Sequence, residues 1–277
     1  MLTVKTLETI ELADVVAVFN DAFADYFVPF HVDQHYLYRR WRAARVDYKL
    51  SAGVFEESQL VGFLVIGIDE LHGKRTAYNA ATGVVPAYRG KHLVKRMYEA
   101  VLPLLQAAGV KQATLEVITQ NEIAIKAYTG IGYSIRSTLL CFSGVIKIAI
   151  QSAVKLTKTK NIPWERVQKM SSFPNTWEAS LVALRIASAD YECWYLEEAG
   201  NLEAFVIVNP GSGFIGRLGF ASGDVDRYGN RLLAEIGKEV PFVKINNVDR
   251  RESELIRLLL DTGLENHINQ YEMVMDL

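Results

Sequence analysis

Residues 82–98 place Arg89, Gly90 and Lys91 at a turn that leads from a strand into a helix. The first amides of a helix have no acceptor within the helix and carry a partial positive charge, so an anion bound there meets backbone donors. Pro86 ends the strand because proline cannot donate to a β-ladder, and Gly90 lets the backbone approach a bulky polyanion. The segment predicts a phosphate-binding turn, although it has neither the P-loop nor the Rossmann glycine pattern.

A second polar group consists of Glu116, with Asn121 five and Tyr128 twelve residues after it. A carboxylate on a strand covered on both faces is costly without a purpose. A phenol has a pKa suited to protonating a departing thiolate. Two structural alternatives stay open: Tyr128 as a packing residue on an apolar helix face, and Glu116 as a carboxylate at the solvated end of a sheet.

Residues 76–133 resemble the GNAT superfamily of acyl-CoA-dependent N-acyltransferases. The family's lead-in V-x-P-x-Y-R-G is present and ends at Gly90, but His92 and Val94 stand where the family has two further small residues. Because the expected ligands are main-chain amides in a helical first turn, where non-glycine dihedral angles are favourable, we expect this departure to be tolerated; His92 could add a donor. The resemblance implies that coenzyme A is contacted by Val84, Val85, Arg89, Gly90, Lys91, His92, Leu93, Val94 and Asn121.

The resemblance also implies catalytic roles. Glu116, Asn121 and Tyr128 fit the L-E-V-x-x-x-N-x-x-A-x-x-x-Y arrangement of ribosomal-protein alanine acetyltransferases, in which the Glu is a water-mediated base. Tyr128 occupies the family's general-acid position, and the backbone at Val84 and Val85 would polarise the acyl oxygen if its strand separates from the neighbouring strand. The implied reaction is direct transfer of an acetyl group from acetyl-CoA to a primary amine in a ternary complex, without a metal.

The acceptor amine cannot be identified from the sequence. The region of Asp21, Asp25 and Tyr26 borders the acceptor cleft in the family, so these acids either hold a cationic amine or form the polar end of a helix. Two alternatives to acetyl transfer stay open: an acyltransferase that uses a longer acyl-CoA, and a non-catalytic acyl-CoA-binding or regulatory module. Retention of Tyr128 favours an enzyme, because a pure binder needs no acid at the thiol.

Hydrophobic spacing predicts the elements that position these residues. Strands are expected at 4–7, 54–55, 60–68, 76–85 and 113–118, and helices at 12–23, after Pro29, at 93–108 and at 124–131. This order predicts an α/β fold with an α+β mixed sheet, and it matches the acyl-CoA N-acyltransferase (GNAT) fold.

The chain also repeats itself. Residues 55–66 are echoed by 196–208, and 125–133 by 256–264, the latter 131 residues later. Chance recurrence of a hairpin with a Glu-Glu turn is the alternative, but two matches in the same order favour a duplicated domain. We therefore predict a catalytic domain at 1–145, a linker and the start of a second domain at 146–175, and a degenerate GNAT-like domain at 176–277.

The second copy has lost the chemistry of the first. At the 131-residue offset, Asn121 becomes Glu252 and Tyr128 becomes Leu259. Residues 221–227 carry two acids where a polyphosphate would need donors, and these charges would repel the ligand. We expect only the first half to bind the cofactor, and the second to serve packing or acceptor recognition.

Composition excludes several classes of protein. The 277 residues include 30 basic and 32 acidic side chains, so there is no global attraction to nucleic acid or to an anionic membrane. The longest apolar run, 61–68, is too short for a membrane span, and the N-terminus lacks the form of a secretion signal. We expect a cytoplasmic protein in which Cys141 and Cys193 are buried reduced thiols; the oligomeric state is not predicted.

Two N-terminal clusters are set aside. Arg39, Arg42 and Arg45 could form a nucleic-acid patch, but an amphipathic helix with a solvated charged face explains them better. His31 and His35 could share a metal with Asp33, but Pro29 and Phe30 make this segment a loop entering a helix, and it offers no third ligand, so we expect no metal.

Overall fold

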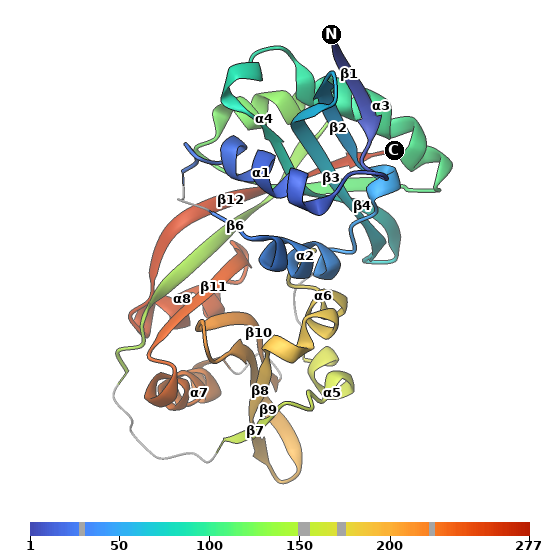
Figure 1. Ribbon diagram of the computed structural model, residues 1–277. Coiled ribbons are helices and arrows are strands. Elements are labelled where there is room, and N and C mark those ends of the chain that lie inside the picture. The colour runs from blue at the N-terminus through green and yellow to red at the C-terminus, as the bar shows by residue number, and fades with distance from the viewer. Residues whose placement is uncertain (28–30, 149–155, 171–175, 222–224) are drawn as a thin grey trace. The chain divides into compact units, whose positions relative to one another are not determined.

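The computed structural model describes residues 1–27, 31–148, 156–170, 176–221 and 225–277, which form two compact units (Figure 1). Unit 1 comprises Met1–Arg136 and Glu272–Leu277, and unit 2 comprises Ser137–Tyr271. Pro29 and Phe30 lie outside the described residues, as do parts of the predicted linker at 146–175 and of the acidic turn at 221–227.

Unit 1 is built on a mixed sheet in the order β1-β2-β3-β4-β5, followed by the end of β12 and the start of β6. Its strands are β1 (Leu2–Thr6), β2 (Ala52–Glu56), β3 (Gln59–Leu71), β4 (Lys74–Val84), β5 (Gln112–Ile118), β6 (Ser134–Val145) and β12 (Glu265–Asp276). Its helices are α1 (Leu12–Ala22), α2 (Gln34–Ala43), α3 (Leu93–Ala107) and α4 (Glu122–Thr129), with 3-10 turns η1 (Tyr48–Leu50) and η2 (Pro86–Tyr88). Neighbouring strands from β1 to β4 run antiparallel, whereas β4 and β5 run parallel.

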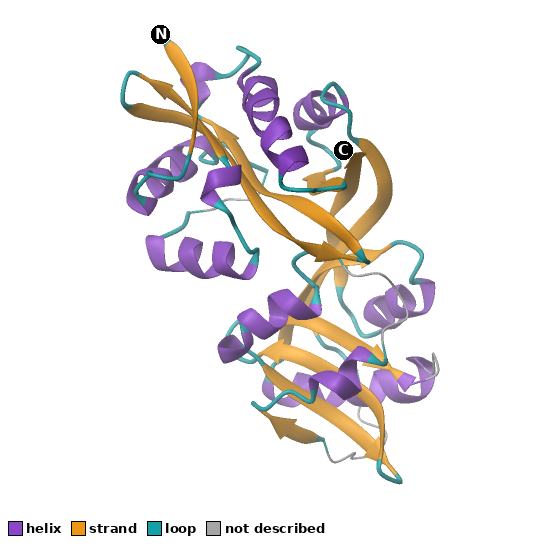
Figure 2. Cartoon of the chain, turned by 90° about the vertical axis from the view of Figure 1, so that its right-hand side faces the viewer, coloured by secondary structure: helices purple, strands orange, loops and turns teal. Residues whose placement is uncertain are grey.

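Helices cover the strands of unit 1 on both sides (Figure 2). On α1, residues spaced by about one turn are buried, and Phe19 stacks on Phe63 of β3 with ring centroids 5.7 Å apart. On α3, Met97, Val101 and Leu105 are buried in the same periodic way. The helices predicted from this periodicity are confirmed within a few residues at each end.

The end of the C-terminal strand, Glu272–Leu277, joins unit 1, whereas the first part of that strand belongs to unit 2. Thr114 Oγ1 of β5 donates to the Met273 carbonyl at 3.1 Å, and the Leu277 amide donates to the Lys111 carbonyl at 3.1 Å. Glu272, which is 8% exposed at its side chain, pairs with Arg136. The contact units therefore differ from the predicted boundaries, which assigned all of 176–277 to the second domain.

Unit 2 repeats the element order of unit 1. Its elements are β7 (Thr157–Thr159), α5 (Trp164–Gln168), α6 (Leu181–Ile186), η3 (Ser188–Asp190), β8 (Glu192–Glu198), β9 (Asn201–Asn209), β10 (Phe214–Phe220), α7 (Val225–Glu239), β11 (Phe242–Asp249) and α8 (Ser253–Asp261). With β6 and the first part of β12, they form a sheet in the order β12-β6-β11-β10-β9-β8-β7. The succession β8-β9-β10-α7-β11-α8-β12 parallels β2-β3-β4-α3-β5-α4-β6, as the internal repeat predicts.

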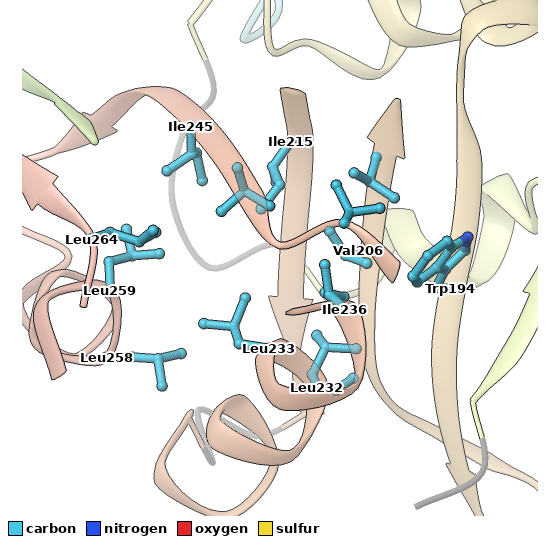
Figure 3. Close-up of a cluster of buried hydrophobic side chains, with 14 of the residues drawn as sticks. Trp194, Val206, Ile215, Leu232, Leu233, Ile236, Ile245, Leu258, Leu259 and Leu264 are labelled. Atoms are coloured by element: carbon cyan, nitrogen blue, oxygen red, sulfur yellow. The ribbon is translucent and has the colours of Figure 1, made fainter. Parts of the chain in front are cut away.

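An apolar cluster fills the space between the sheet and the two longer helices of unit 2 (Figure 3). It contains Leu232 and Leu233 from α7, Leu258 and Leu259 from α8, and Leu264, which is 2% exposed. Both cysteines are buried: Cys141 lies on β6 and Cys193 on β8. Burial raises the pKa of the Cys193 thiol to about 12, so it stays a neutral hydrophobic side chain.

Candidate active site

Strands β4 and β5 separate part of the way along their length. The parallel ladder joins Thr76 to Gln112, Ala77 to Ala113 and Tyr78 to Thr114, and ends there although both strands continue. On its other edge, β4 stays paired to β3 as far as Val84, and the Val85 amide donates to the Val61 carbonyl at 3.1 Å. The β5-facing edge of β4 beyond Tyr78 is therefore an open strand edge within the sheet, which we call the β4/β5 opening.

The turn after β4 leads into α3 through two residues with left-handed backbone angles. Gly90 has φ +77°, and a Cβ built on it would meet nothing within 4 Å. His92 has φ +54° and directly precedes the helix, which begins at the buried Leu93. A non-glycine residue costs about 1–2 kcal/mol in this region. The expectation of favourable non-glycine angles at His92 was wrong, because this residue stands outside the helical turn.

The first amides of α3 have no acceptor within the helix, and the exposed turn leads directly to them. Lys91 is also exposed, and its Nζ lies 4.7 Å from the centre of the Tyr88 ring. These features suit a polyanion, because the donors are fixed by the backbone and a cation stands beside them. The contacts with coenzyme A that the resemblance implies at this turn and at Val94 stay a prediction.

The Arg89 side chain is already engaged. It donates two hydrogen bonds to the Asp25 carboxylate, at 2.6 and 2.7 Å, one to the Ala22 carbonyl at 3.0 Å and one to the Val84 carbonyl at 3.2 Å. Its hydrogen bond to Asp25 is the main cause that lowers the pKa of that carboxyl. Arg89 thus fastens the end of α1 to the end of β4, and Asp25, considered above as an acceptor-binding acid, is its counter-ion.

Tyr128 lies on α4 and is only 9% exposed. Its hydroxyl oxygen accepts a hydrogen bond from Asn79 Nδ2 at 3.4 Å. Burial raises the pKa of Tyr128, while hydrogen bonds with Thr82 and Asn79 act in the opposite direction. The hydroxyl therefore stays protonated at neutral pH and lies beside the segment of β4 that borders the β4/β5 opening.

A chain of buried polar groups continues behind Tyr128. Asn79 Nδ2 also donates to the Tyr98 hydroxyl at 2.9 Å, and Tyr98 lies 3.2 Å from the Tyr133 hydroxyl. Thr82 Oγ1 donates to Asn79 Oδ1 at 2.9 Å. Sequence reasoning missed this group, because its members come from separate strands and helices. The one available signal was Asn79 itself, a polar residue in the middle of the predicted strand 76–85.

Glu116 lies on β5, two residues beyond the last ladder pair, and is partly exposed. It accepts a hydrogen bond from the hydroxyl of Tyr78 at 2.5 Å, and Tyr78 is 3% exposed. The carboxylate is thus held at the β4/β5 opening by a buried phenol that the sequence did not point to. The choice between a base and a carboxylate at the solvated end of the sheet is not made by this contact.

Glu116 and Tyr128 lie on opposite faces of the sheet. Tyr78 and Asn79 are consecutive residues of β4, so their side chains point to opposite faces. Tyr78 contacts Glu116 and Asn79 contacts Tyr128. The opening therefore has a carboxylate on one side and a phenol on the other, as a proton acceptor and a proton donor acting on two different groups would require.

Asn121 has a structural function at the start of α4. Its side-chain oxygen accepts from the Ala124 amide at 3.1 Å, which is an N-cap contact. It also hydrogen-bonds the Tyr26 hydroxyl, an interaction that partly offsets the rise of the Tyr26 pKa caused by burial. Tyr26, expected near the acceptor, is thus held at the start of α4, the helix that carries Tyr128. A contact of Asn121 with coenzyme A stays a prediction.

Unit 2 has apolar side chains where unit 1 has its tyrosines. At the 131-residue offset, Leu259 and Leu264 stand in place of Tyr128 and Tyr133, and both belong to the apolar cluster in Figure 3. Glu252, in place of Asn121, precedes α8 without a side-chain cap, and burial raises its pKa. The described part of unit 2 therefore has no phenol at the position of Tyr128.

The N-terminal clusters have structural explanations. Asp33 caps α2 by accepting from the Tyr36 amide at 2.7 Å, and Arg45 pairs with Asp69 at 3.0 Å. Within the described ranges, no three His, Cys, Asp or Glu side chains gather as metal ligands would. No helix in those ranges is long and apolar enough to cross a membrane.

Comparisons with known proteins bear on the family and the fold. Residues 15–133 match the sequence model of the acetyltransferase (GNAT) family. Over 79 residues the chain is 27% identical to the uncharacterized N-acetyltransferase YdgE of Bacillus subtilis (strain 168). The aligned residues make up 28% of this chain and 50% of that relative, so the chain spans about half the length of the relative.

Two solved structures cover nearly the whole chain. A tandem GNAT protein from the clavulanic acid biosynthesis pathway has a TM-score of 0.73 at 14% identity, over 100% of this chain and 98% of its own. A GCN5-related N-acetyltransferase from Sphaerobacter thermophilus has a TM-score of 0.71 at 12% identity, over 99% and 95%.

Residues 15–133 thus match the GNAT family of N-acetyltransferases, and the mixed α/β fold of the chain is that of tandem GNAT proteins. The predicted resemblance to the GNAT family and the predicted fold class are confirmed. The family match implies an acyl-CoA donor and an amine acceptor. The part that matches the family lies in unit 1, which also contains the β4/β5 opening.

Proposed function

We propose that unit 1 transfers an acetyl group from acetyl-CoA to a primary amine by direct attack in a ternary complex. The observation that carries this proposal is the β4/β5 opening, with Glu116 on one face of the sheet and Tyr128 on the other. The attacking amine must lose a proton and the departing thiolate must gain one, so a base and an acid that reach two different atoms suit this reaction. Holding both substrates at one opening would supply much of the rate.

The residues at the start of α3 fit the phosphates of coenzyme A. Gly90 leaves room for a close approach to the backbone, and Lys91 is exposed beside the free amides of the helix. The side chains of His92 and Val94 need not contact the phosphates, since the donors are main-chain groups. When bound, acetyl-CoA would supply the acyl thioester and leave as a thiol.

The chain's own groups would then act at three places. Glu116 would draw a proton from the acceptor ammonium through a water molecule. Amide groups on the β5-facing edge of β4, such as that of Val84, would donate to the acyl oxygen, whereas the Val85 amide already donates to the Val61 carbonyl, so the predicted role of that amide is corrected. Tyr128, whose pKa is raised by burial, holds a proton on its hydroxyl that can be delivered to the departing sulfur.

We place catalysis in unit 1 alone and assign unit 2 to packing or acceptor recognition. The support is the apolar cluster that occupies the positions of Tyr128 and Tyr133 in unit 2. The predicted boundaries at 145 and 175 are retained as a proposal for the functional halves, with Glu272–Leu277 completing the sheet of unit 1.

The test is a thiol-release screen of acetyl-CoA against amino acids, polyamines, aminoglycosides and peptide N-termini, with longer acyl-CoAs run in parallel. We expect one amine class to give saturable turnover that Tyr128→Phe suppresses. If turnover is found only with longer acyl-CoAs, the transferred group is a longer acyl chain and not acetyl. Tight coenzyme A binding with no turnover on any amine would favour the binding module instead.

A further inference from the structure

Asn79 is the central residue of the polar chain behind Tyr128. It is 7% exposed on β4, and its amide is used completely: Oδ1 accepts from Thr82, and Nδ2 donates to Tyr98 and to Tyr128. A side-chain amide has two N–H donors, so both are committed to hydroxyl oxygens. The hydrogen bond from Thr82 fixes which end of the amide faces the tyrosines.

This arrangement sets the direction of the hydroxyl protons. Because the oxygen of Tyr128 accepts from Asn79, the proton of Tyr128 must point away from Asn79. Tyr98 likewise accepts from Asn79, so its own proton is directed to Tyr133 at 3.2 Å. The proton of Tyr128 therefore lies on the side of its oxygen away from Asn79, where Thr82 also hydrogen-bonds the hydroxyl and from where the proton can be passed to a ligand.

We infer that Asn79 is a positioning residue for the reaction: by donating to the Tyr128 oxygen it turns the phenolic proton away from the protein interior and toward the reacting sulfur. This inference rests on the proposed function of Tyr128 as the acid. The same N–H group also favours the phenolate left after proton transfer, since a hydrogen bond to the charged form stabilises it. No covalent bond to the protein is formed; one proton leaves the Tyr128 oxygen for the sulfur and is regained from water.

Unit 2 serves as an internal comparison for this inference. At the 131-residue offset, the positions of Tyr128 and Tyr133 are leucines in an apolar cluster (Figure 3). An apolar core at these positions is therefore compatible with the fold. Buried polar networks are destabilising unless every member is satisfied, so the tyrosines at these two positions of unit 1 are better explained by chemistry than by packing.

Asn79→Asp provides the most direct test, because it keeps the shape and exchanges an N–H donor for an oxygen acceptor. The Tyr128 proton would then turn inward to the new carboxyl group. We expect kcat to fall by about 10²-fold, as for loss of a general acid, with little change in the KM for acetyl-CoA. In a Tyr128→Phe background the same substitution should cause no further loss of kcat, because Asn79 acts through that hydroxyl.

Asn247→Asp in unit 2 is the matched control. Asn247 Oδ1 accepts from Gln270 Nε2 at 2.8 Å, and aspartate keeps that acceptor, so turnover should stay at the parent level. Thr82→Val is the second test variant if Asn79→Asp does not fold. It removes the hydrogen bond that fixes the Asn79 amide, together with the hydrogen bond of Thr82 with Tyr128, and should lower kcat by about threefold or more, as loss of a neutral hydrogen bond does.

A readout without turnover separates this inference from the proposed function. In protein labelled with ¹³C at tyrosine Cζ, titration of the Tyr128 signal, assigned with Tyr128→Phe, should give a higher pKa in Asn79→Asp, or in Thr82→Val, than in the parent. An unchanged Tyr128 pKa, or a kcat loss that persists in full in the Tyr128→Phe background, would overturn the inference. A fully active Tyr128→Phe enzyme would refute the acid instead, while the titration would still decide whether Asn79 controls the Tyr128 proton.

Discussion

Removal of the Tyr128 hydroxyl separates catalysis from stability. In Tyr128→Phe, the acid is lost, and we expect kcat to fall by roughly 10²-fold or more, which is about 2.7 kcal/mol in activation free energy. One N–H of Asn79 loses its acceptor, at 3.4 Å in the parent, so folding stability should fall by about 1 kcal/mol. That corresponds to a decrease in Tm of roughly 2–4 °C for a protein of this size.

The assay is steady-state thiol release, with calorimetry for coenzyme A and a thermal melt on the same preparations. The affinity for coenzyme A should stay near the parent value, because the phosphate turn at Arg89–Val94 is not touched. Tyr228→Phe in unit 2 is the control for loss of a buried phenol: Tyr228 is 3% exposed and its hydroxyl donates to Glu198, so it should affect Tm without affecting kcat. Turnover of Tyr128→Phe within a few-fold of the parent would make Tyr128 a packing residue.

Three further predictions concern the turn and the base. If the Arg89–Asp25 pair acts by fastening α1 to β4, Arg89→Gln and Asp25→Asn should weaken coenzyme A binding in calorimetry by similar factors. A loss of affinity in Arg89→Gln alone would show that the guanidinium binds phosphate. His92→Gly should raise Tm and preserve coenzyme A affinity, because glycine relieves the left-handed angle at φ +54° while the amide donors remain; a loss of affinity would show that the imidazole is a donor. Glu116→Gln should lower kcat/KM most near neutral pH. As pH rises, the acceptor amine becomes neutral by itself, so the kcat/KM of the variant should approach that of the parent. A pH profile with the parent's shape and rate would leave Glu116 without a catalytic role.

Most helices and strands of unit 1 could be predicted because their apolar spacing is local and strong. The burial of Val15 and Phe19 on α1, and of Met97 and Val101 on α3, follows the helical period directly. The phosphate turn was also predictable, since its residues are contiguous in the sequence. Its backbone was not: the left-handed angle of His92 could not be read from the sequence, because non-glycine residues adopt that region uncommonly, even though histidine does so more often than most.

The features that escaped prediction depend on distant pairs. Arg89 is 64 residues from Asp25, and Asn79 is 49 residues from Tyr128, so no local pattern connects them. The transfer of Glu272–Leu277 to unit 1 had the same cause. Strands β6 and β12 follow equivalent helices, and alternation along a strand specifies which side is buried but not which neighbour it joins.

The placement of the two cysteines supports direct transfer over an acyl-enzyme route. A covalent route needs an activated nucleophile near the thioester, and thiolates are the most reactive candidates. The chain has two cysteines, Cys141 and Cys193, and both are buried residues of unit 2. Burial raises the pKa of Tyr128, so its hydroxyl keeps its proton until a thiolate takes it. A protonated phenol is not suited to attack the thioester as a phenolate would. With Glu116 on the opposite face, the groups at the β4/β5 opening suit the proposed reaction, in which the amine attacks the thioester itself while the acceptor and acetyl-CoA are bound together.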